Sequence, residues 1–220
     1  MKISCVVPAY NEEKKIKTII EKLQSFSDEI IVVDDGSKDK TFTIASQTKA
    51  VVVRHIINRG QGAALRTGTN LALERGADII VHFDGDDQFQ ASDIPALVKP
   101  ILENKADAVL GSRFLGIDSN LPKFKKHVIM PLARLINRLF FNIRLSDPQS
   151  GFRVLSRKSA KNLKIENDRM AHCSEIIHRL FQNGDRVVEV PIKVIYHEYG
   201  QKLSGGLRII KDIIIQKLIN

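Results

Sequence analysis

VVPAYNEE at residues 6–13 joins an apolar run to a polar, acidic turn, and this kind of junction recurs along the first half of the chain. Five apolar runs rich in Val and Ile are separated by longer segments with helical spacing, and they are Ile3–Ala9, Glu29–Asp34, Ala50–His55, Asp78–Asp84 and Ala106–Ser112. Short β-branched runs that alternate with helical segments predict repeated β-α units. Because these runs are apolar throughout, we expect an α/β fold with an open, mostly parallel sheet covered by helices on both faces.

Capping residues predict where the first helices begin and end. Asn11 is expected to cap a helix that runs through Lys22, and Thr41 is expected near the start of the next helix. Gly62 is expected to open a third helix and Gly76 to close it.

The regular alternation stops after Ser112, and four elements are expected in the second half. Strands are predicted at Ser150–Leu155 and Val187–Tyr196, with a helix at about Ser174–Gln182 between them. Amphipathic helices are predicted at Ile129–Ile143 and, at the C-terminus, Leu207–Leu218.

Length and composition indicate one globular domain spanning residues 1–220, since 43% of the residues are hydrophobic and 27% are charged. The two cysteines provide neither a disulfide framework nor a paired zinc motif, so a reducing compartment is expected. The N-terminus lacks the apolar core of a signal peptide, and no run approaches the roughly 20 apolar residues of a membrane span. Export and membrane crossing are therefore not expected.

The positive charge is concentrated in one segment. The net charge is +9, and residues 113–161 alone carry 11 basic and 2 acidic side chains. A basic surface of this kind suits an anionic ligand or an anionic membrane leaflet. Nucleic acid is not expected as a partner, because no recognition motif or aromatic platform accompanies the basic residues.

Acidic side chains gather where two predicted strands end. Asp34 and Asp35 follow IIVV, and Asp84 and Asp86 follow IIVHF. Carboxyl ends of strands are where ligands bind in this architecture, and two carboxylates spaced as D-x-D can share a divalent cation with a diphosphate. A turn that simply favours Asp and Gly is the alternative interpretation of each pair.

Six motifs together resemble family 2 glycosyltransferases of the GT-A, Rossmann-like fold, particularly polyprenyl-phosphate sugar transferases related to dolichyl-phosphate mannose synthase. The resemblance covers nearly the whole chain. The motifs are VVPAYNEE (6–13), VVDDGSKDKT (32–41), NRGQGAALRTG (58–68), FDGDDQ (83–88), GSRF (111–114) and DPQSGFR (147–153). By this resemblance, residues 1–112 form a nucleotide-sugar-binding half and residues 113–220 an acceptor-side half.

The resemblance implies a nucleotide-sugar pocket, whose expected residues are Pro8, Ala9, Tyr10, Glu12, Asp34, Asp35, Gly62 and Asp84. Asp35 would lie on the base or ribose side. The alternatives are purely structural roles, namely a strand end at Pro8, a packing role for Tyr10 and a helix-dipole role for Glu12. Gly60 and Gly62 permit a close backbone approach to phosphate before a helix, although G-x-G alone is a weak signal.

The resemblance also implies a divalent cation, Mg²⁺ or Mn²⁺, held with the donor diphosphate by Asp84, Asp86 and Gln88. Asp87 is expected to be a solvated side chain. Arg113 follows a predicted strand, and its guanidinium is expected to neutralise phosphate unless it is an ordinary surface arginine.

The implied reaction is attack by an acceptor oxygen on the anomeric carbon of a UDP- or GDP-linked hexose, with inversion. A polyprenyl (dolichyl or undecaprenyl) phosphate needs no strong base, because a phosphate monoester has a second pKa of about 6. A saccharide or protein hydroxyl would need a carboxylate to accept its proton. Asp147, preferred over Glu175, is the predicted base in that case, with a turn residue before Pro148 as the alternative. Asp86, Asp147, Arg113 and Arg153 are thus the predicted catalytic residues.

Four basic side chains are expected at the acceptor phosphate, and they are Arg113, Arg153, His197 and Lys202. A structural ion pair at Arg153 and an ordinary surface position for His197 are the alternatives. The helix at Ile129–Ile143 could pack on the core or lie in the membrane interface, and the sequence leaves both open.

We therefore expect a cytoplasmic enzyme, peripherally associated with the cytoplasmic membrane face, with a separate membrane protein as a possible anchor. A noncatalytic nucleotide-sugar binder is the rival interpretation, and the intact Asp84, Asp86 and Gln88 speak against it.

Overall fold

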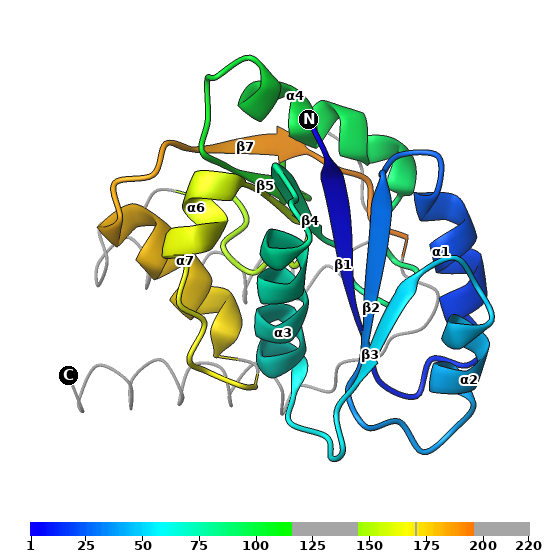
Figure 1. Ribbon diagram of the computed structural model, residues 1–220. Helices are drawn as coiled ribbons and strands as arrows, with labels where there is room; N and C mark the ends of the chain where they lie inside the picture. The colour runs from blue at the N-terminus through cyan, green and yellow to red at the C-terminus, as the bar shows by residue number, and fades with distance from the viewer. Residues whose placement is uncertain (116–144, 170, 196–220) are drawn as a thin grey trace.

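A mixed β-sheet forms the centre of the protein, for which a computed structural model describes residues 1–115, 145–169 and 171–195. In these ranges the sheet has seven strands in the order β3-β2-β1-β4-β6-β5-β7 (Figure 1). The strands are β1 (Ile3–Ala9), β2 (Glu29–Asp34), β3 (Val51–Arg54), β4 (Ile79–His82), β5 (Ala108–Ser112), β6 (Arg153–Ser156) and β7 (Val187–Pro191). Of the seven strands in these ranges, only β6 runs antiparallel to its neighbours, β4 and β5.

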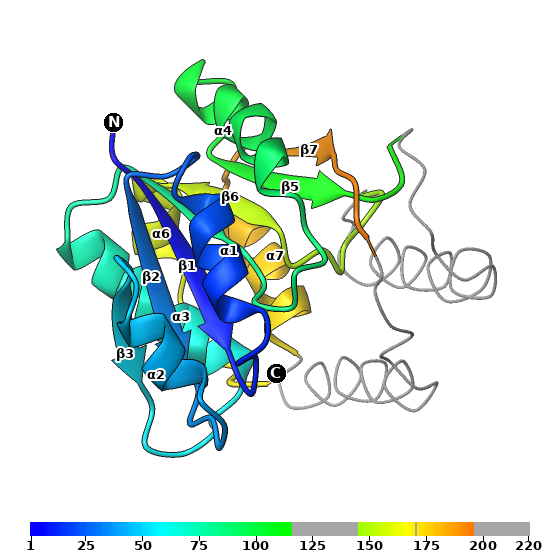
Figure 2. The same cartoon turned by 90° about the vertical axis from the view of Figure 1, so that its right-hand side faces the viewer.

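Helices cover both faces of the sheet, as Figures 1 and 2 show. One face carries α1 (Ile16–Leu23), α2 (Thr41–Ser46), the short 3-10 helix η1 (Ala91–Asp93) and α4 (Ile94–Leu102). The other face carries α3 (Gln61–Glu74), α6 (Arg157–Asn162) and α7 (His172–Gln182). The predicted α/β class, with an open, mostly parallel sheet between helical layers, is confirmed.

Alternate side chains of each strand supply two separate cores. In β1, Cys5 and Val7 pack with α1 and α4, whereas Val6 points to the opposite face and packs with α3. All three side chains are fully buried. A strand with period-2 geometry that is buried on both faces must be apolar throughout, which explains the continuous Val and Ile runs.

The structure confirms β1 and β2 with their predicted bounds, and the other strands are shorter than expected. One capping prediction is wrong. Asn11 does not cap α1, because that helix begins at Ile16 and Lys15 precedes it without a side-chain cap. Asn11 adopts a left-handed backbone with φ 57°, and its side-chain oxygen accepts a hydrogen bond from the Lys38 amide (2.9 Å).

The predicted helices at 129–143 and 207–218 lie outside the described residues. Within the described ranges, no helix combines the length and apolar character needed to cross a bilayer.

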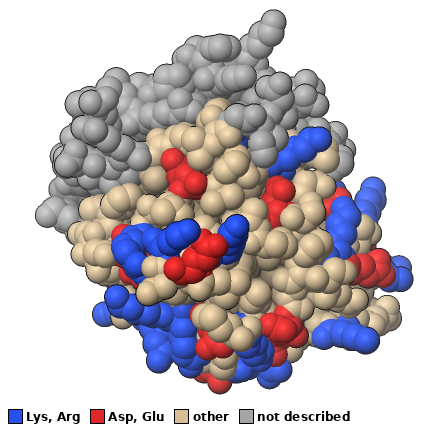
Figure 3. Space-filling model, turned by 90° about the horizontal axis from the view of Figure 1, so that it is seen from above, with Lys and Arg blue, Asp and Glu red and all other residues tan. Residues whose placement is uncertain are grey.

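The edge of the sheet where the strands begin shows a mixture of charges, as Figure 3 shows from above. Ion pairs join neighbouring elements at this edge. Glu29 at the start of β2 pairs with Lys2 (3.2 Å) and with Arg75 (2.8 Å).

The opposite edge brings together the ends of β1, β2 and β4. Because β6 is antiparallel, its first residue reaches this edge too, and Arg153 pairs in register with His82 at the end of β4. The motif DPQSGFR is thereby placed beside FDGDDQ, although about 60 residues separate the two in the sequence.

Candidate active site

The loop after β4 positions two carboxylates at the carboxyl edge of the sheet. Gly85 lies between them because any β-carbon there would come within 2.7 Å of the Pro8 carbonyl oxygen at the end of β1. The Gln61 side chain, at the start of α3, donates a hydrogen bond to Asp84 Oδ1 (2.6 Å). Gly151 packs against the Asp84 carboxylate so closely that a β-carbon at this position would collide with it.

Asp84 is a carboxyl group in an unfavourable environment for a negative charge. Burial, and next the negative charge of Asp86, raise its pKa to about 7, although Arg153 and His172 act in the opposite direction. The pKa of Asp86 is also raised, chiefly by burial, although its Oδ1 accepts a hydrogen bond from the Gln88 amide (3.1 Å). A divalent cation would relieve the repulsion between the two carboxylates.

These residues fit a cation that takes part of its ligand set from a substrate. In the described ranges no group of three or more His, Cys, Asp or Glu side chains is arranged to hold a metal ion. Asp84 and Asp86 would therefore need oxygen ligands from elsewhere, such as a diphosphate. Gln88 is held by its backbone, since its carbonyl accepts a hydrogen bond from the Ile195 amide (2.9 Å).

Asp87, the next acid of the loop, is bound by a lysine of α1. It has a left-handed backbone with φ 58° and forms an ion pair with Lys22 of α1 (2.7 Å). It is therefore tied to the protein surface by an ion pair, whereas the sequence predicted a solvated side chain.

Beside Asp84 and Cys173 lies a buried arginine, and its positive charge acts on both of these groups. Arg153 is fully buried, and its Nε, Nη1 and Nη2 atoms have no hydrogen-bond partner within the described ranges. The buried Ser150 Oγ and His82 Nδ1 atoms are also without a partner there. Buried polar groups are nearly always satisfied, so three such groups near one carboxylate indicate a site made for a polar ligand.

His82 cannot share the positive charge of Arg153. Burial, followed by the charges of Arg153 and His172, lowers the pKa of His82 to about 3. Its Nε2 atom lies 2.9 Å from Thr69 Oγ1 of α3. His82 is thus a neutral polar group, and Arg153 and His172 supply the positive charge of this part of the site.

A cysteine and histidine pair at the start of α7 completes the same cluster. Cys173 Sγ lies 3.4 Å from His172 Nε2. Burial opposes ionisation of the thiol, but the charges of His172 and Arg153 outweigh it and lower the pKa of Cys173 to about 6. The pKa of His172 is raised by Cys173 despite burial. No signal in the sequence pointed to this pair, because two cysteines far apart in the chain indicate neither a disulfide nor a zinc site.

Arg113 and Asp147, predicted respectively for phosphate and for proton transfer, bind each other. Arg113 Nε lies 2.6 Å from Asp147 Oδ2 and Nη2 lies 2.7 Å from Oδ1, while the Arg113 amide also donates to Oδ2 (3.1 Å). Asp147 is fully buried. Glu189 of β7 accepts hydrogen bonds from the Ser146 and Asp147 amides (2.7 and 2.9 Å) and fixes the backbone there.

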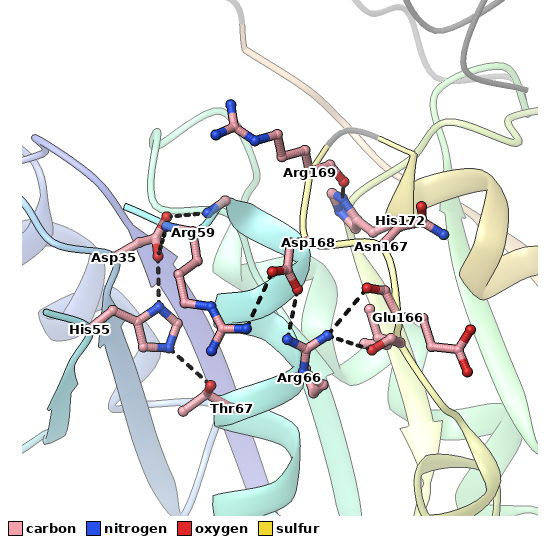
Figure 4. A network of polar contacts seen from close by, with 12 residues as sticks. Asp35, His55, Arg59, Arg66, Thr67, Glu166, Asn167, Asp168, Arg169 and His172 are labelled. Atoms are coloured by element: carbon pink, nitrogen blue, oxygen red, sulfur yellow. Dashed lines mark hydrogen bonds and ion pairs between the residues drawn. The ribbon is translucent and has the colours of Figure 1, made fainter. Parts of the chain in front are cut away.

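The two acids after β2 shape the neighbouring loop. Asp35 Oδ1 lies 2.7 Å from His55 Nδ1 and accepts a hydrogen bond from the Arg59 amide (3.0 Å), and Oδ2 accepts one from the Gly60 amide (2.7 Å) (Figure 4). Asp34 forms an ion pair with Arg54 (3.0 Å). Contact of Asp34 and Asp35 with a nucleoside stays a prediction.

The expected nucleoside-pocket residues of VVPAYNEE lie at this same edge. Pro8 and Ala9 are buried at the end of β1, and Tyr10 is 41% exposed directly after it. The Glu12 amide donates a hydrogen bond to Thr41 Oγ1 (2.8 Å), and burial raises the pKa of the Glu12 carboxyl in spite of nearby Lys15.

The structure offers a reason for Gly62 that does not involve phosphate. The amide of Gly62 donates a hydrogen bond to the Asp168 carbonyl oxygen (2.9 Å), and a β-carbon on Gly62 would collide with the Asn167 carbonyl oxygen. The Asp168 side chain pairs with Arg66 (2.7 Å) and Arg59 (3.3 Å), which Figure 4 shows converging on it. Sequence spacing gave no signal for this contact between α3 and residues 165–169.

Two predicted acceptor residues, His197 and Lys202, lie outside the described residues, as do most of the basic residues of 113–161.

Comparison with known proteins identifies the family. The sequence pattern of glycosyl transferase family 2 matches residues 4–164. The UDP-N-acetylglucosamine–dolichyl-phosphate N-acetylglucosaminyltransferase of Methanococcus voltae is 35% identical over 98% of this chain and 96% of its own length. The undecaprenyl-phosphate mannosyltransferase of Micrococcus luteus is 30% identical over 94% of this chain and 89% of its own. An uncharacterised protein of Methanocaldococcus jannaschii is 39% identical over 98% and 92%.

Among solved structures, glucosyl-3-phosphoglycerate synthase from Mycobacterium tuberculosis, in complex with phosphoglyceric acid, superimposes with a TM-score of 0.74. The match covers 95% of this chain and 77% of that one at 24% identity, so the likeness is one of fold. With the family pattern over most of its length and curated relatives at this identity, the chain belongs to glycosyl transferase family 2 and has the GT-A fold.

Proposed function

We propose that this glycosyltransferase moves a hexose from a UDP- or GDP-linked donor to a polyprenyl phosphate. The observation that carries the proposal is Arg153, a buried guanidinium without a hydrogen-bond partner in the described ranges, beside the Asp84 carboxylate. A phosphate bound there would accept hydrogen bonds from its unsatisfied donors. The acceptor class is that named for the relatives from Methanococcus voltae and Micrococcus luteus.

On the donor side, Asp84, Asp86 and Gln88 would hold Mg²⁺ or Mn²⁺, and Pro8, Ala9, Tyr10 and Glu12 would line the nucleoside pocket. The cation, when bound, supplies positive charge that stabilises the departing diphosphate. Asp35 acts through the loop that it holds, because its carboxylate oxygens are engaged by His55 and by the amides of Arg59 and Gly60.

On the acceptor side, a phosphate oxygen attacks the anomeric carbon from the face opposite the diphosphate. The new carbon–oxygen bond forms as the bond to the diphosphate breaks, the nucleoside diphosphate leaves, and the sugar inverts its configuration. The phosphate oxygen is already anionic near neutral pH, so no side chain has to accept a proton. Arg153 orients the phosphate.

The ion pair of Arg113 with Asp147 favours this acceptor over a hydroxyl. A base must have a free lone pair directed at the acceptor, whereas the Asp147 carboxylate is buried and bound by three Arg113 hydrogen bonds. A polyprenyl phosphate would be met at the cytoplasmic membrane face, by a peripherally associated protein. A separate membrane anchor protein stays a prediction.

The test is transfer of labelled sugar from a panel of UDP- and GDP-sugars, with Mg²⁺ or Mn²⁺, into extractable lipid in the presence of polyprenyl phosphate. We expect metal-dependent label in the lipid fraction, its loss in Asp86→Asn, and a large fall in Arg153→Lys. Arg75→Gln is the matched control, since Arg75 pairs with Glu29 at the opposite edge of the sheet. Donor binding without lipid label, together with transfer to a saccharide, would overturn the acceptor assignment.

A further inference from the structure

The loop between β3 and α3 presents two adjacent isoleucines to solvent. Ile56 is fully exposed, at 101% of its reference surface, and Ile57 is 68% exposed. Single exposed apolar side chains are ordinary on a protein surface, but two neighbours at a loop tip form an apolar patch that the described fold does not use.

The backbone on both sides of this tip is fixed, so the isoleucines are held outward. Before it, His55 lies between Asp35 (2.7 Å) and Thr67 (3.0 Å). After it, the Arg59 and Gly60 amides donate to Asp35 (3.0 and 2.7 Å), as Figure 4 shows for Arg59.

The inner side of the tip is fixed as well. Gly36, with φ 71°, packs so closely that a β-carbon would lie 2.7 Å from the Ile57 carbonyl carbon and 2.8 Å from the Asn58 nitrogen. Local hydrogen bonds and packing thus hold the backbone of the tip in place, with both isoleucine side chains exposed to solvent.

Basic side chains surround the apolar tip. Arg54 and Arg59 flank it in the sequence, with side chains 46% and 47% exposed, and Lys38 and Lys40 are exposed on the loop that begins with Gly36. Arg54 pairs with Asp34, and Arg59 and Arg66 pair with Asp168, so these charges largely cancel. Asp39 accepts hydrogen bonds from Thr41 and from the Glu13 amide. Lys38 and Lys40 are the exposed cations beside the apolar tip, and an apolar side chain next to lysines is typical of contact with an anionic lipid surface.

The loop lies at the correct edge of the sheet for such a contact. It follows the carboxyl end of β3, and Figures 1 and 2 show it projecting beyond the strand ends on the side where β1 and β2 also end. Asp84 and Arg153 lie at this same edge.

We propose that Ile56 and Ile57 insert into the interfacial region of an anionic bilayer while Lys38 and Lys40 contact its headgroups. The contact turns the candidate active site toward the membrane. The inference rests on the proposed function only for this orientation, since binding to lipid can be measured without donor or acceptor.

The test measures binding of the full chain to two kinds of vesicle, phosphatidylcholine alone and phosphatidylcholine with about 30% phosphatidylglycerol. Only the second kind has the negative surface charge that attracts basic residues. Ile56→Ser/Ile57→Ser is compared with Leu102→Ser, a matched control because Leu102 is 53% exposed at the end of α4, away from this loop. We expect the double variant to lower the partition coefficient for anionic vesicles about tenfold or more, and the control to change it less than about twofold.

A second measurement locates the contact. The emission of an environment-sensitive fluorophore on Ile57→Cys should shift to the blue on anionic vesicles, and the emission of one on Leu102→Cys should not. Labelling of the unsubstituted protein measures how far the two buried native cysteines react. Unchanged partitioning of the double variant, or no shift at position 57, would overturn the proposal.

A third outcome would show that the isoleucine patch contacts another protein chain and not lipid. If the double variant changes the oligomeric state in sedimentation without changing vesicle binding, the patch joins two copies of this chain and the lipid proposal is wrong. The double variant should retain donor binding, so a failure of the proposed function would appear separately, as absent sugar transfer by the unsubstituted protein.

Discussion

Arg113 and Asp147 bind each other through two side-chain contacts of 2.6 and 2.7 Å, at the point where the motif GSRF meets the motif DPQSGFR. The pair joins the end of β5 to the segment before β6, and Asp147 is fully buried. Removing one member would leave the other without its partner.

Asp147→Asn should therefore act on stability as well as on activity. We expect the free energy of unfolding to fall by on the order of 3 kcal/mol, because an unpaired arginine would remain in a partly buried position. Urea denaturation measures this. If Asp147 were only a base, the variant would lose activity with unchanged stability, and its pH profile would lose the limb belonging to a carboxylate.

Divalent cations should stabilise the protein more at high pH than at low pH. The raised pKa of Asp84, about 7, means that the folded protein holds this proton more tightly than the unfolded chain does. Protonation therefore adds stability as the pH falls below about 7, and it competes with the cation. We expect apparent Mn²⁺ affinity to be about tenfold weaker at pH 6 than at pH 8. Thermal shifts measure it, and Asp84→Asn should abolish both the shift and its pH dependence.

Asp35→Asn should weaken donor binding more than it slows the chemical step. The amide keeps the size of the carboxylate but lacks the charge and one acceptor, so the hydrogen bonds to Arg59, Gly60 and His55 cannot all be kept. A loss of about 1–3 kcal/mol in stability is expected from the unsatisfied groups. Calorimetry of UDP or GDP binding is the readout, and an unchanged affinity would argue against a positioning role.

Gly62→Ala should destabilise the fold by about 3 kcal/mol, the upper end for overpacking, since the new β-carbon would meet the Asn167 backbone and lie 2.9 Å from His172 Cβ. Gly76→Ala is the control. Nothing lies within 4 Å of that position, and only its φ of 86° opposes the substitution, at a cost of about 1 kcal/mol. Equal effects of the two substitutions would contradict the close contact at Gly62.

Cys173 should titrate well below an ordinary thiol. Its pKa of about 6 predicts thiolate absorbance near neutral pH, while burial raises the pKa of Cys5 to about 12. The chain contains no Trp, which simplifies absorbance measurements in the far ultraviolet. The difference spectrum between the unsubstituted protein and Cys173→Ser should titrate with a midpoint near pH 6. A midpoint near 9 would show that His172 and Arg153 do not stabilise the thiolate.

Sequence patterns predicted the fold because local and global signals agree in the first half of the chain. The bounds of β1 and β2 follow from apolar runs that end in Pro-Ala and Asp-Asp, and the helix starting at Thr41 follows from turn residues. The motifs also located Asp84 and Asp86, since residues directly after a strand are placed by that strand alone.

Contacts between distant segments were beyond such reasoning. Three contacts depend on the position of β6 in the sheet. They are the ion pair of Asp147 with Arg113, the capping of α3 by residues 165–169, and the contact of Cys173 with His172 beside Arg153. Periodicity predicts a strand near Ser150–Leu155 but carries no information on its direction or its neighbours. Asn11 failed as a cap because a residue type that suits an N-cap equally suits a left-handed turn.

The reversed strand β6 also has an evolutionary consequence. The chain leaves β5 at Ser112 and enters β6 at Arg153, and both points lie at the same edge of the sheet. Residues added to or removed from the connection between them need not disturb any strand pairing. A family built on this sheet can therefore vary the length of this connection while keeping the strand order and the loop that holds Asp84 and Asp86.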